Sequence, residues 1–186
     1  MCWADARLTE LGREQASKLR PAMLAHRLDV VLVSPLSRAI QTALLAIPYR
    51  QPFVVEDDVR ERIGTHPCDR RRTRAEIKAD FPEVDVSPLA TEEDDKWTPE
   101  REPMADLIAR TERMLHKLKN RPETHIGITT HNDFLTALLF DSSLKLADPA
   151  LRRKFGNAEH MALVLTWTTV GKETPDDASS VTASIA

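Results

Sequence analysis

Apolar residues along the chain alternate between helical and strand-like spacing. Between Leu8 and Met23 they recur every three or four residues, which predicts a helix over about 10–26 that Pro21 kinks. Residues 29–33 are apolar and β-branched without polar alternation, which is typical of a strand buried on both faces. A second helix is predicted from Ser37 to Pro48, and a short strand over 53–55.

The second half of the chain repeats this alternation. Residues 104–118 carry the clearest apolar stripe and predict a helix. A strand over 125–130, a helix through 134–139 and a last strand over 161–167 follow. Alternating strands and helices predict an α/β fold, a three-layer sandwich around a mostly parallel central sheet, within one domain over residues 1–170.

Two segments depart from this pattern. The stretch from 56 to about 103 is largely polar and interrupted by prolines, so we predict an insert over the sheet, with a short helix at 74–80. Its acidic run 92–95 is predicted to be a solvated loop. Residues 171–186 are rich in Ser, Thr, Asp and Ala, which predicts a disordered tail.

Composition and charge narrow the possible functions. The 26 basic and 29 acidic residues leave a net charge of −3, and no apolar run approaches the ~20 residues of a membrane span. We therefore expect no nucleic-acid or membrane partner and, by default, a cytoplasmic protein with reduced cysteines. Five widely spaced glycines form neither a P-loop nor a dinucleotide-binding motif. The oligomeric state is not determined by the sequence.

Two strand-to-helix junctions carry the candidate chemistry. Arg38 follows the strand over 29–33, and His131 follows the strand over 125–130. Because ligands bind at the carboxyl ends of parallel strands, both side chains are expected to face one crevice. A guanidinium and an imidazolium there would form a phosphate-sized anion site. Taken singly, Arg38 would favour a surface salt bridge, and His131 could equally be a hydrogen-bonded structural histidine.

Three segments in this order resemble the histidine phosphatase superfamily and its phosphoglycerate-mutase-like fold. They are Leu-Thr-Glu-Leu-Gly-Arg-Glu-Gln-Ala from position 8, Ser-Pro-Leu-Ser-Arg-Ala-Ile-Gln-Thr-Ala from position 34, and Thr-His-Asn-Asp-Phe-Leu from position 130. The resemblance implies a phosphomonoesterase or mutase that acts through a phosphohistidine. It also implies that Arg38 and His131 bind phosphate and that His131 is catalytic. Asn132 stands where the family usually has glycine.

The resemblance implies further site residues in the insert. Glu61 matches the family's proton-donating acid, with a loop salt bridge as the alternative. His66, Asp69 and Arg70 resemble residues that rim the substrate pocket in some members. A metal site from His66, Cys68 and Asp69 is the less favoured alternative, because its spacing is not that of a zinc module. We expect no metal or organic cofactor, and phosphate or a phosphorylated small molecule as the partner.

The family's nucleophile belongs to an Arg-His-Gly motif at the end of a first strand, and this sequence contains no Arg-His-Gly. We therefore expect the first strand to be missing and the chain to be inactive as given. The family is expected to place that strand between the two junction strands, so its absence would leave two unpaired edges and a marginally stable chain. The alternatives are a non-catalytic protein that binds or responds to a phosphorylated ligand, and a truncated gene product.

Overall fold

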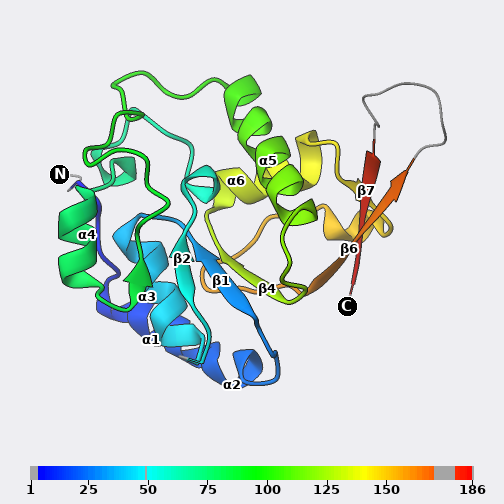
Figure 1. The fold of residues 1–186 in the computed structure, drawn as a ribbon, viewed down its shortest axis with the longest axis horizontal. Coiled ribbons are helices and arrows are strands. Elements are labelled where there is room, and N and C mark those ends of the chain that lie inside the picture. Colours follow the sequence, from blue (N-terminus) through cyan, green and yellow to red (C-terminus); the bar gives the residue numbers. More distant parts are fainter. Residues whose placement is uncertain (1–3, 49, 170–178, 186) are drawn as a thin grey trace.

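The computed structural model describes residues 4–48, 50–169 and 179–185. Four parallel strands form its central sheet in the order β3-β2-β1-β4 (Figure 1). The strands are β1 (Val30–Val33), β2 (Phe53–Val55), β3 (Val84–Asp85) and β4 (Ile126–Thr129). The predicted α/β fold with a parallel central sheet is thereby confirmed.

The helices lie close to their predicted positions. They are α1 (Glu10–Lys18), α2 (Arg20–Met23), α3 (Ser37–Ala46), α4 (Arg74–Asp80), α5 (Met104–Lys119) and α6 (Asn132–Thr136), and α6 continues as the π-helical turn η3 (Ala137–Asp141). Short 3-10 turns are η1 (Asp57–Val59), η2 (Pro67–Asp69) and η4 (Pro149–Leu151). Pro21 stands in the first turn of α2, where the predicted first helix breaks in two. No helix within the described ranges is long and apolar enough to cross a membrane.

Strand β1 is buried on both faces, as its unbroken apolar run predicts. Val31 and Val33 belong to a core with α3, whereas Val30 and Leu32 belong to a second core with α5 and α6. Successive side chains of a strand point to opposite faces, so one apolar run supplies both cores. The sheet is thus the middle layer of the predicted sandwich, with α3 on one side and α5 on the other (Figure 1).

A second sheet contains β5 (Lys145–Leu146), β6 (Leu163–Thr169) and β7 (Ser179–Ile185) in the order β5-β7-β6. The prediction of a disordered tail over 171–186 is therefore wrong for 179–185, and the remainder of that tail lies outside the described residues. Val181 and Ala183 are buried in this strand between more polar neighbours. That two-residue period is the strand signal, and the polar composition of the tail masked it.

The edges of the central sheet differ from expectation. Strand β1 pairs directly with β4, with Val33 opposite Thr129, so the prediction that a missing strand separates these two strands is wrong. Four residues of each strand match in register, which leaves no room for another strand between them. Within the described part of the chain, the far edge of β4 pairs with no strand, and Ile128 on it is 36% exposed.

We expect this edge to make the chain aggregation-prone and to keep its melting temperature below about 55 °C, within the usual range of mesophilic domains. Light scattering during thermal unfolding measures both quantities. Ile128→Lys places a charge on the exposed edge and should slow aggregation, whereas Leu11→Lys, on an exposed position of helix α1, serves as control. Reversible melting above about 55 °C would contradict the expectation.

The insert is more closely joined to the sheet than predicted. Helix α4 forms where expected, and a capping box between Thr73 and Glu76 begins it. Strand β3, also within the insert, pairs with β2 and so extends the sheet at its edge. The acidic run 92–95 is not uniformly solvated, because Asp94 is buried.

Candidate active site

The two predicted junctions meet at one edge of the central sheet. Ser34 directly follows β1, and His131 comes two residues after β4. The Nε2 atom of His131 lies 2.8 Å from the Oγ atom of Ser34, and both residues are buried. Because β1 and β4 are parallel neighbours in register, their carboxyl ends stand side by side. This pairing brings together groups that lie 97 positions apart in the sequence.

The surroundings of His131 disfavour the imidazolium predicted from the sequence. Burial lowers its pKa well below the ordinary value of 6.5, and the positive charges of Arg38, Arg60 and Arg110 lower the pKa further. A bound anion would offset these charges and favour protonation of His131.

This pKa makes folding stability depend on pH. In the unfolded chain His131 gains a proton near pH 6.5, whereas in the folded chain burial lowers its pKa well below that value. The unfolded state therefore binds more protons, and the free energy of unfolding falls as the pH drops through 6.5. The expected slope is up to about 1.4 kcal/mol per pH unit, measured by urea unfolding between about pH 7.5 and 5.5. His131→Gln should flatten this slope, and His116→Gln, an exposed histidine on α5, should not. Equal slopes for all three proteins would contradict the assignment.

Arg38 lies in the first turn of α3, and its guanidinium is tied to η2. Its Nη1 donates to the Cys68 carbonyl at 2.7 Å, and its Nη2 donates to Asp69 Oδ1 at 2.8 Å. The beginning of α3 is itself held by Asp5, whose carboxylate accepts from the backbone N–H and the hydroxyl of Ser37 at 2.7 and 2.5 Å. These contacts fix the backbone from which the Arg38 side chain extends.

Glu61 joins the same group of residues through the first turn of α6. Its Oε1 accepts from the backbone N–H of Asp133 at 3.2 Å and from that of Arg62 at 2.9 Å. Burial raises the pKa of Glu61, and the nearby carboxylates of Asp133 and Asp69 raise it further, although the backbone hydrogen bond from Arg62 and the charge of Arg38 act in the opposite direction. A carboxyl group with a raised pKa holds its proton at higher pH, which suits it to donate that proton.

The backbone that carries Glu61 is held from α5 by Arg110. The Nη1 and Nη2 atoms of this buried side chain donate to the carbonyls of Asp58, Arg60 and Glu61 at 2.7, 3.0 and 3.1 Å. Its Nε and Nη2 atoms also donate to the carboxylate of Glu102 at 2.8 and 2.7 Å. Helix α5 therefore positions the loop before Glu61.

The three insert residues predicted at the substrate rim lie in different surroundings. His66 and Arg70 are exposed, and the Arg70 guanidinium lies over the ring of Trp97, 5.7 Å from its centroid. Asp69 is buried beneath Arg38, so it holds a cation and does not face solvent. Within the described residues, no group of three or more His, Cys, Asp or Glu side chains is arranged to hold a metal ion.

Arg101 completes this group of charges and was not anticipated from the sequence. Its Nη1 donates to Asp69 Oδ2 at 3.0 Å and to the Gly64 carbonyl at 2.9 Å, and its Nη2 donates to Asp133 Oδ2 at 3.2 Å. It stands in a loop before α5 with no motif around it. Only the return of that loop toward η2 and α6 brings Arg101 near Arg38.

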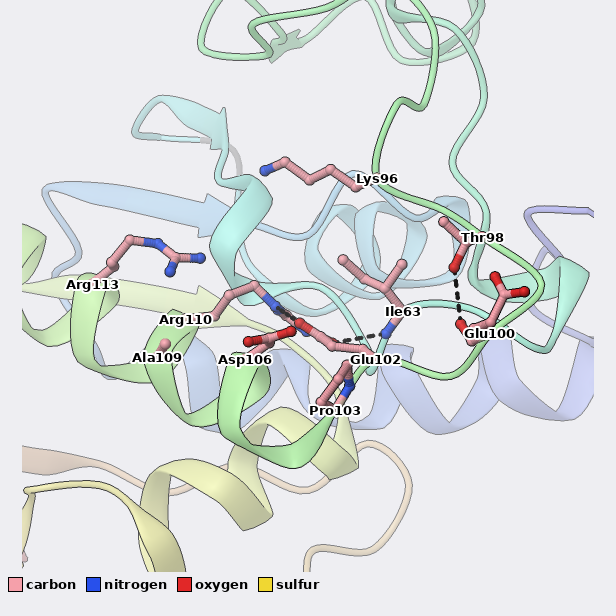
Figure 2. A pocket seen from close by; sticks show the side chains of 10 residues that line it. All are labelled: Ile63, Lys96, Thr98, Glu100, Glu102, Pro103, Asp106, Ala109, Arg110 and Arg113. Carbon is pink, nitrogen blue, oxygen red and sulfur yellow. Dashed lines mark hydrogen bonds and ion pairs between the residues drawn. The ribbon is translucent and has the colours of Figure 1, made fainter.

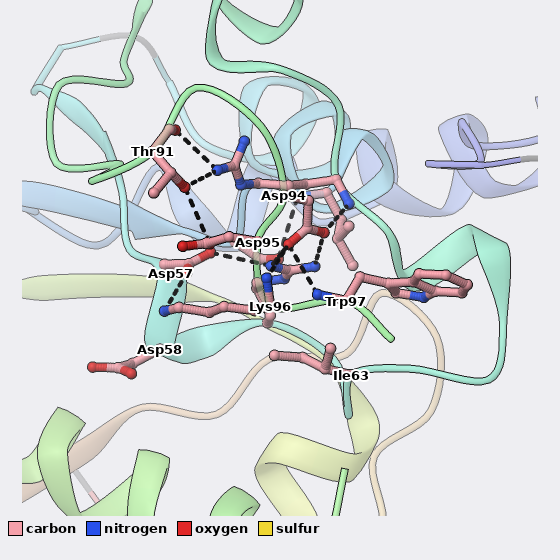
Figure 3. Close-up of polar contacts among 12 residues, drawn as sticks. Asp57, Asp58, Ile63, Thr91, Asp94, Asp95, Lys96 and Trp97 are labelled. Atoms are coloured by element: carbon pink, nitrogen blue, oxygen red, sulfur yellow. Dashed lines mark hydrogen bonds and ion pairs between the residues drawn. The ribbon is translucent and has the colours of Figure 1, made fainter. Parts of the chain in front are cut away.

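A deeper set of charges fixes the insert. The buried guanidinium of Arg60 donates to both carboxylate oxygens of Asp94, at 2.9 and 2.6 Å, and to the Asp69 carbonyl at 2.9 Å. Asp94 also accepts from the backbone N–H groups of Arg71 and Trp97 (Figure 3). Burial alone would raise the pKa of Asp94, but the contacts with Arg60 more than offset this effect and lower it.

A cavity of about 460 Å³ lies between α5 and the loop at 96–103 (Figure 2). Its lining combines the cations Lys96 and Arg113 with the acids Glu100 and Asp106 around the apolar Ile63. Lys96 and Arg113 are already paired with aspartates of η1, and the third lining cation, Arg110, is paired with Glu102. The cavity lining includes none of the predicted site residues Arg38, Glu61, His66, Asp69, Arg70 and His131.

Known proteins are similar to this chain in both sequence and fold. A phosphoglycerate mutase-like protein of Arabidopsis thaliana is 34% identical over 169 residues, covering 73% of this chain and 62% of the relative. Phosphoglycerate mutase-like protein 1 of the same plant is 32% identical over 165 residues, covering 70% and 58%. The chain thus spans about three fifths of the length of these curated relatives.

Among solved structures, a mycobacterial glucosyl-3-phosphoglycerate phosphatase has the same fold, with a TM-score of 0.59 and 23% identity over 100% of this chain and 89% of that one. The profile of the histidine phosphatase superfamily, branch 1, matches residues 1–173. The matched range includes the three segments that resemble the family. The second and third of these segments contain the junction residues Arg38 and His131. The chain therefore belongs to branch 1 of the histidine phosphatase superfamily.

Proposed function

We propose that the chain binds the phosphate group of a phosphorylated small molecule at the carboxyl ends of β1 and β4. The observation that carries this proposal is a continuous set of contacts at this edge. His131 contacts Ser34, and the α6 turn that follows His131 holds Glu61 through the backbone N–H of Asp133. The carboxylate of Asp133 is linked to Arg38 through Arg101 and Asp69. Membership of a superfamily of phosphoryl-transfer enzymes supports a phosphomonoester as the ligand.

Each of the three groups suits one part of phosphoryl transfer. Arg38 and His131 would bind the terminal phosphate oxygens, over which the negative charge of the transition state is spread. Glu61 would donate its proton to the leaving oxygen, because its burial keeps that proton bound at higher pH than in a solvated carboxyl. Burial of His131 and its contact with Ser34 favour a binding role over nucleophilic attack.

We further propose that the 186-residue chain binds phosphomonoesters without turning them over. None of its histidines stands in the Arg-His-Gly motif of the family nucleophile. Loss of the nucleophile removes most of the rate enhancement of a covalent mechanism even when the binding groups remain. The chain would therefore bind the ligand, and its groups would support phosphoryl transfer only beside a nucleophile.

Titration calorimetry with inorganic phosphate tests the binding. Arg38→Gln should weaken phosphate binding about tenfold or more, because it removes a charged fork that contacts the anion. Arg121→Gln removes the same charge in the loop before β4, at the opposite end of the sheet, and should change little. Absence of phosphate binding, or equal binding by the Arg38 variant, would refute the proposed site.

A hydrolysis assay with p-nitrophenyl phosphate tests the second part. We expect no turnover above that of the His131→Ala variant. Turnover that disappears in this variant, together with a trapped phosphohistidine, would show that the chain is a catalyst and would overturn the non-catalytic part of the proposal.

A further inference from the structure

The arginines around the site fall into two groups. Arg60, Arg71 and Arg110 are buried, and each makes several hydrogen bonds to backbone carbonyls or carboxylates. Arg38 and Arg101 differ, because their side chains are 24% and 26% exposed. Among the described residues, the Nε atom of each of these two makes no hydrogen bond. A guanidinium has five N–H donors, so both retain donors for a ligand.

Asp69 links the two exposed arginines. Its Oδ1 accepts from Arg38 and its Oδ2 from Arg101, so the two guanidinium groups flank one buried carboxylate. One negative charge between two positive charges leaves a local excess of positive charge. Asp133 offsets part of this excess through its contact with Arg101, but its side chain is 41% exposed and the contact is the longest of the set, at 3.2 Å. Contacts of this kind between exposed groups are weak.

We propose that Arg101 is a second phosphate-binding residue of this site, and that Asp69 is the positioning residue that holds Arg38 and Arg101 as a pair. This inference rests on the proposed function. A terminal phosphate carries three oxygens and up to two charges, which two adjacent guanidinium groups can share. Asp133 competes with that phosphate for Arg101 and is displaced when the phosphate binds.

Phosphate titrations of paired variants test the role of Arg101. Arg101→Gln should weaken phosphate binding about tenfold, and Arg101→Lys, which keeps the charge but loses the fork, should weaken it less. Arg121→Gln is again the control for the change in net charge. Asp69→Asn should weaken phosphate binding in the unaltered chain. In the Arg101→Gln background the same substitution should have a smaller effect, because it then disturbs only Arg38.

Asp133→Asn provides an opposite and independent result. Removal of the competing carboxylate should tighten phosphate binding several-fold, and this gain should disappear when Arg101 is also replaced by Gln. The backbone N–H of Asp133 remains to hold Glu61 in this variant. Asp141→Asn, an exposed aspartate at the end of η3, is the control for loss of one negative charge and should have no such effect.

The outcomes separate this inference from the proposed function. If Arg38→Gln weakens phosphate binding while Arg101→Gln stays within about twofold of the unaltered chain, Arg101 is structural and the inference is wrong, although the binding site stands. If the unaltered chain does not bind phosphate, the proposed function itself fails. If Arg101→Gln does not fold, the Asp133→Asn and Arg101→Lys results decide, and unchanged affinity in both refutes the inference.

Discussion

Asp94→Asn is expected to lower the free energy of unfolding by about 3–5 kcal/mol, the usual effect of leaving a buried charge without its partner. The Arg60 side chain is fully buried, and Asp94 supplies both oxygens of a bidentate contact. A neutral amide cannot balance the guanidinium, and the remaining ion pair of Arg60, with Asp57, is longer at 3.5 Å. Urea unfolding at neutral pH measures the loss.

Asp95→Asn is the matched control, because it makes the same chemical change at the next residue. Asp95 is exposed, and its carboxylate accepts a hydrogen bond from the Thr91 hydroxyl at 3.1 Å. We expect an effect within about 0.5 kcal/mol for this variant. The lowered pKa of Asp94 adds a second readout, because its stabilising effect is lost as the pH falls below 3.8. Equal stabilities of the two variants would show that the buried pair does not hold the insert.

Arg110→Met should destabilise the protein by a similar amount, about 3–5 kcal/mol, and should also release the loop that carries Glu61. The substitution leaves three backbone carbonyls and the Glu102 carboxylate without their donor in a buried region. Phosphate titration and urea unfolding of the same variant measure the two effects. Methionine can fill the volume of the arginine side chain, but it donates no hydrogen bond to these carbonyls, so stability should still fall.

Arg113→Met is the control on the same helix, one turn further along. Its side chain is 53% exposed and pairs with Asp58 at 3.0 Å, so the expected loss is below about 1 kcal/mol. A double variant, Arg110→Met with Glu102→Leu, removes both charges together and should be more stable than the sum of the single changes indicates. Additive effects of the two substitutions would argue against a coupled buried pair.

The elements that the sequence predicts well are those with strong local patterns. The apolar stripe of α5 and the unbroken apolar run of β1 leave few alternatives to a helix and a doubly buried strand. The places of Arg38 and His131 also follow from the sequence, because each comes within a few residues of the end of a strand and parallel strands end at one edge. Their shared location is therefore a consequence of local order in the chain.

The partners of these residues depend on contacts that no local pattern encodes. Asp94 stands in an acidic run that the sequence predicts to be solvated, yet the fold buries it against Arg60, 34 positions away. Arg101 reaches the site only because its loop returns to η2. The pKa of His131 is lowered because the fold buries the ring and brings the positive charges of three arginines near it. Sequence thus determined which groups of this protein stand at the strand ends. Tertiary structure alone decided their charges and neighbours, because burial and proximity arise only when distant segments pack together.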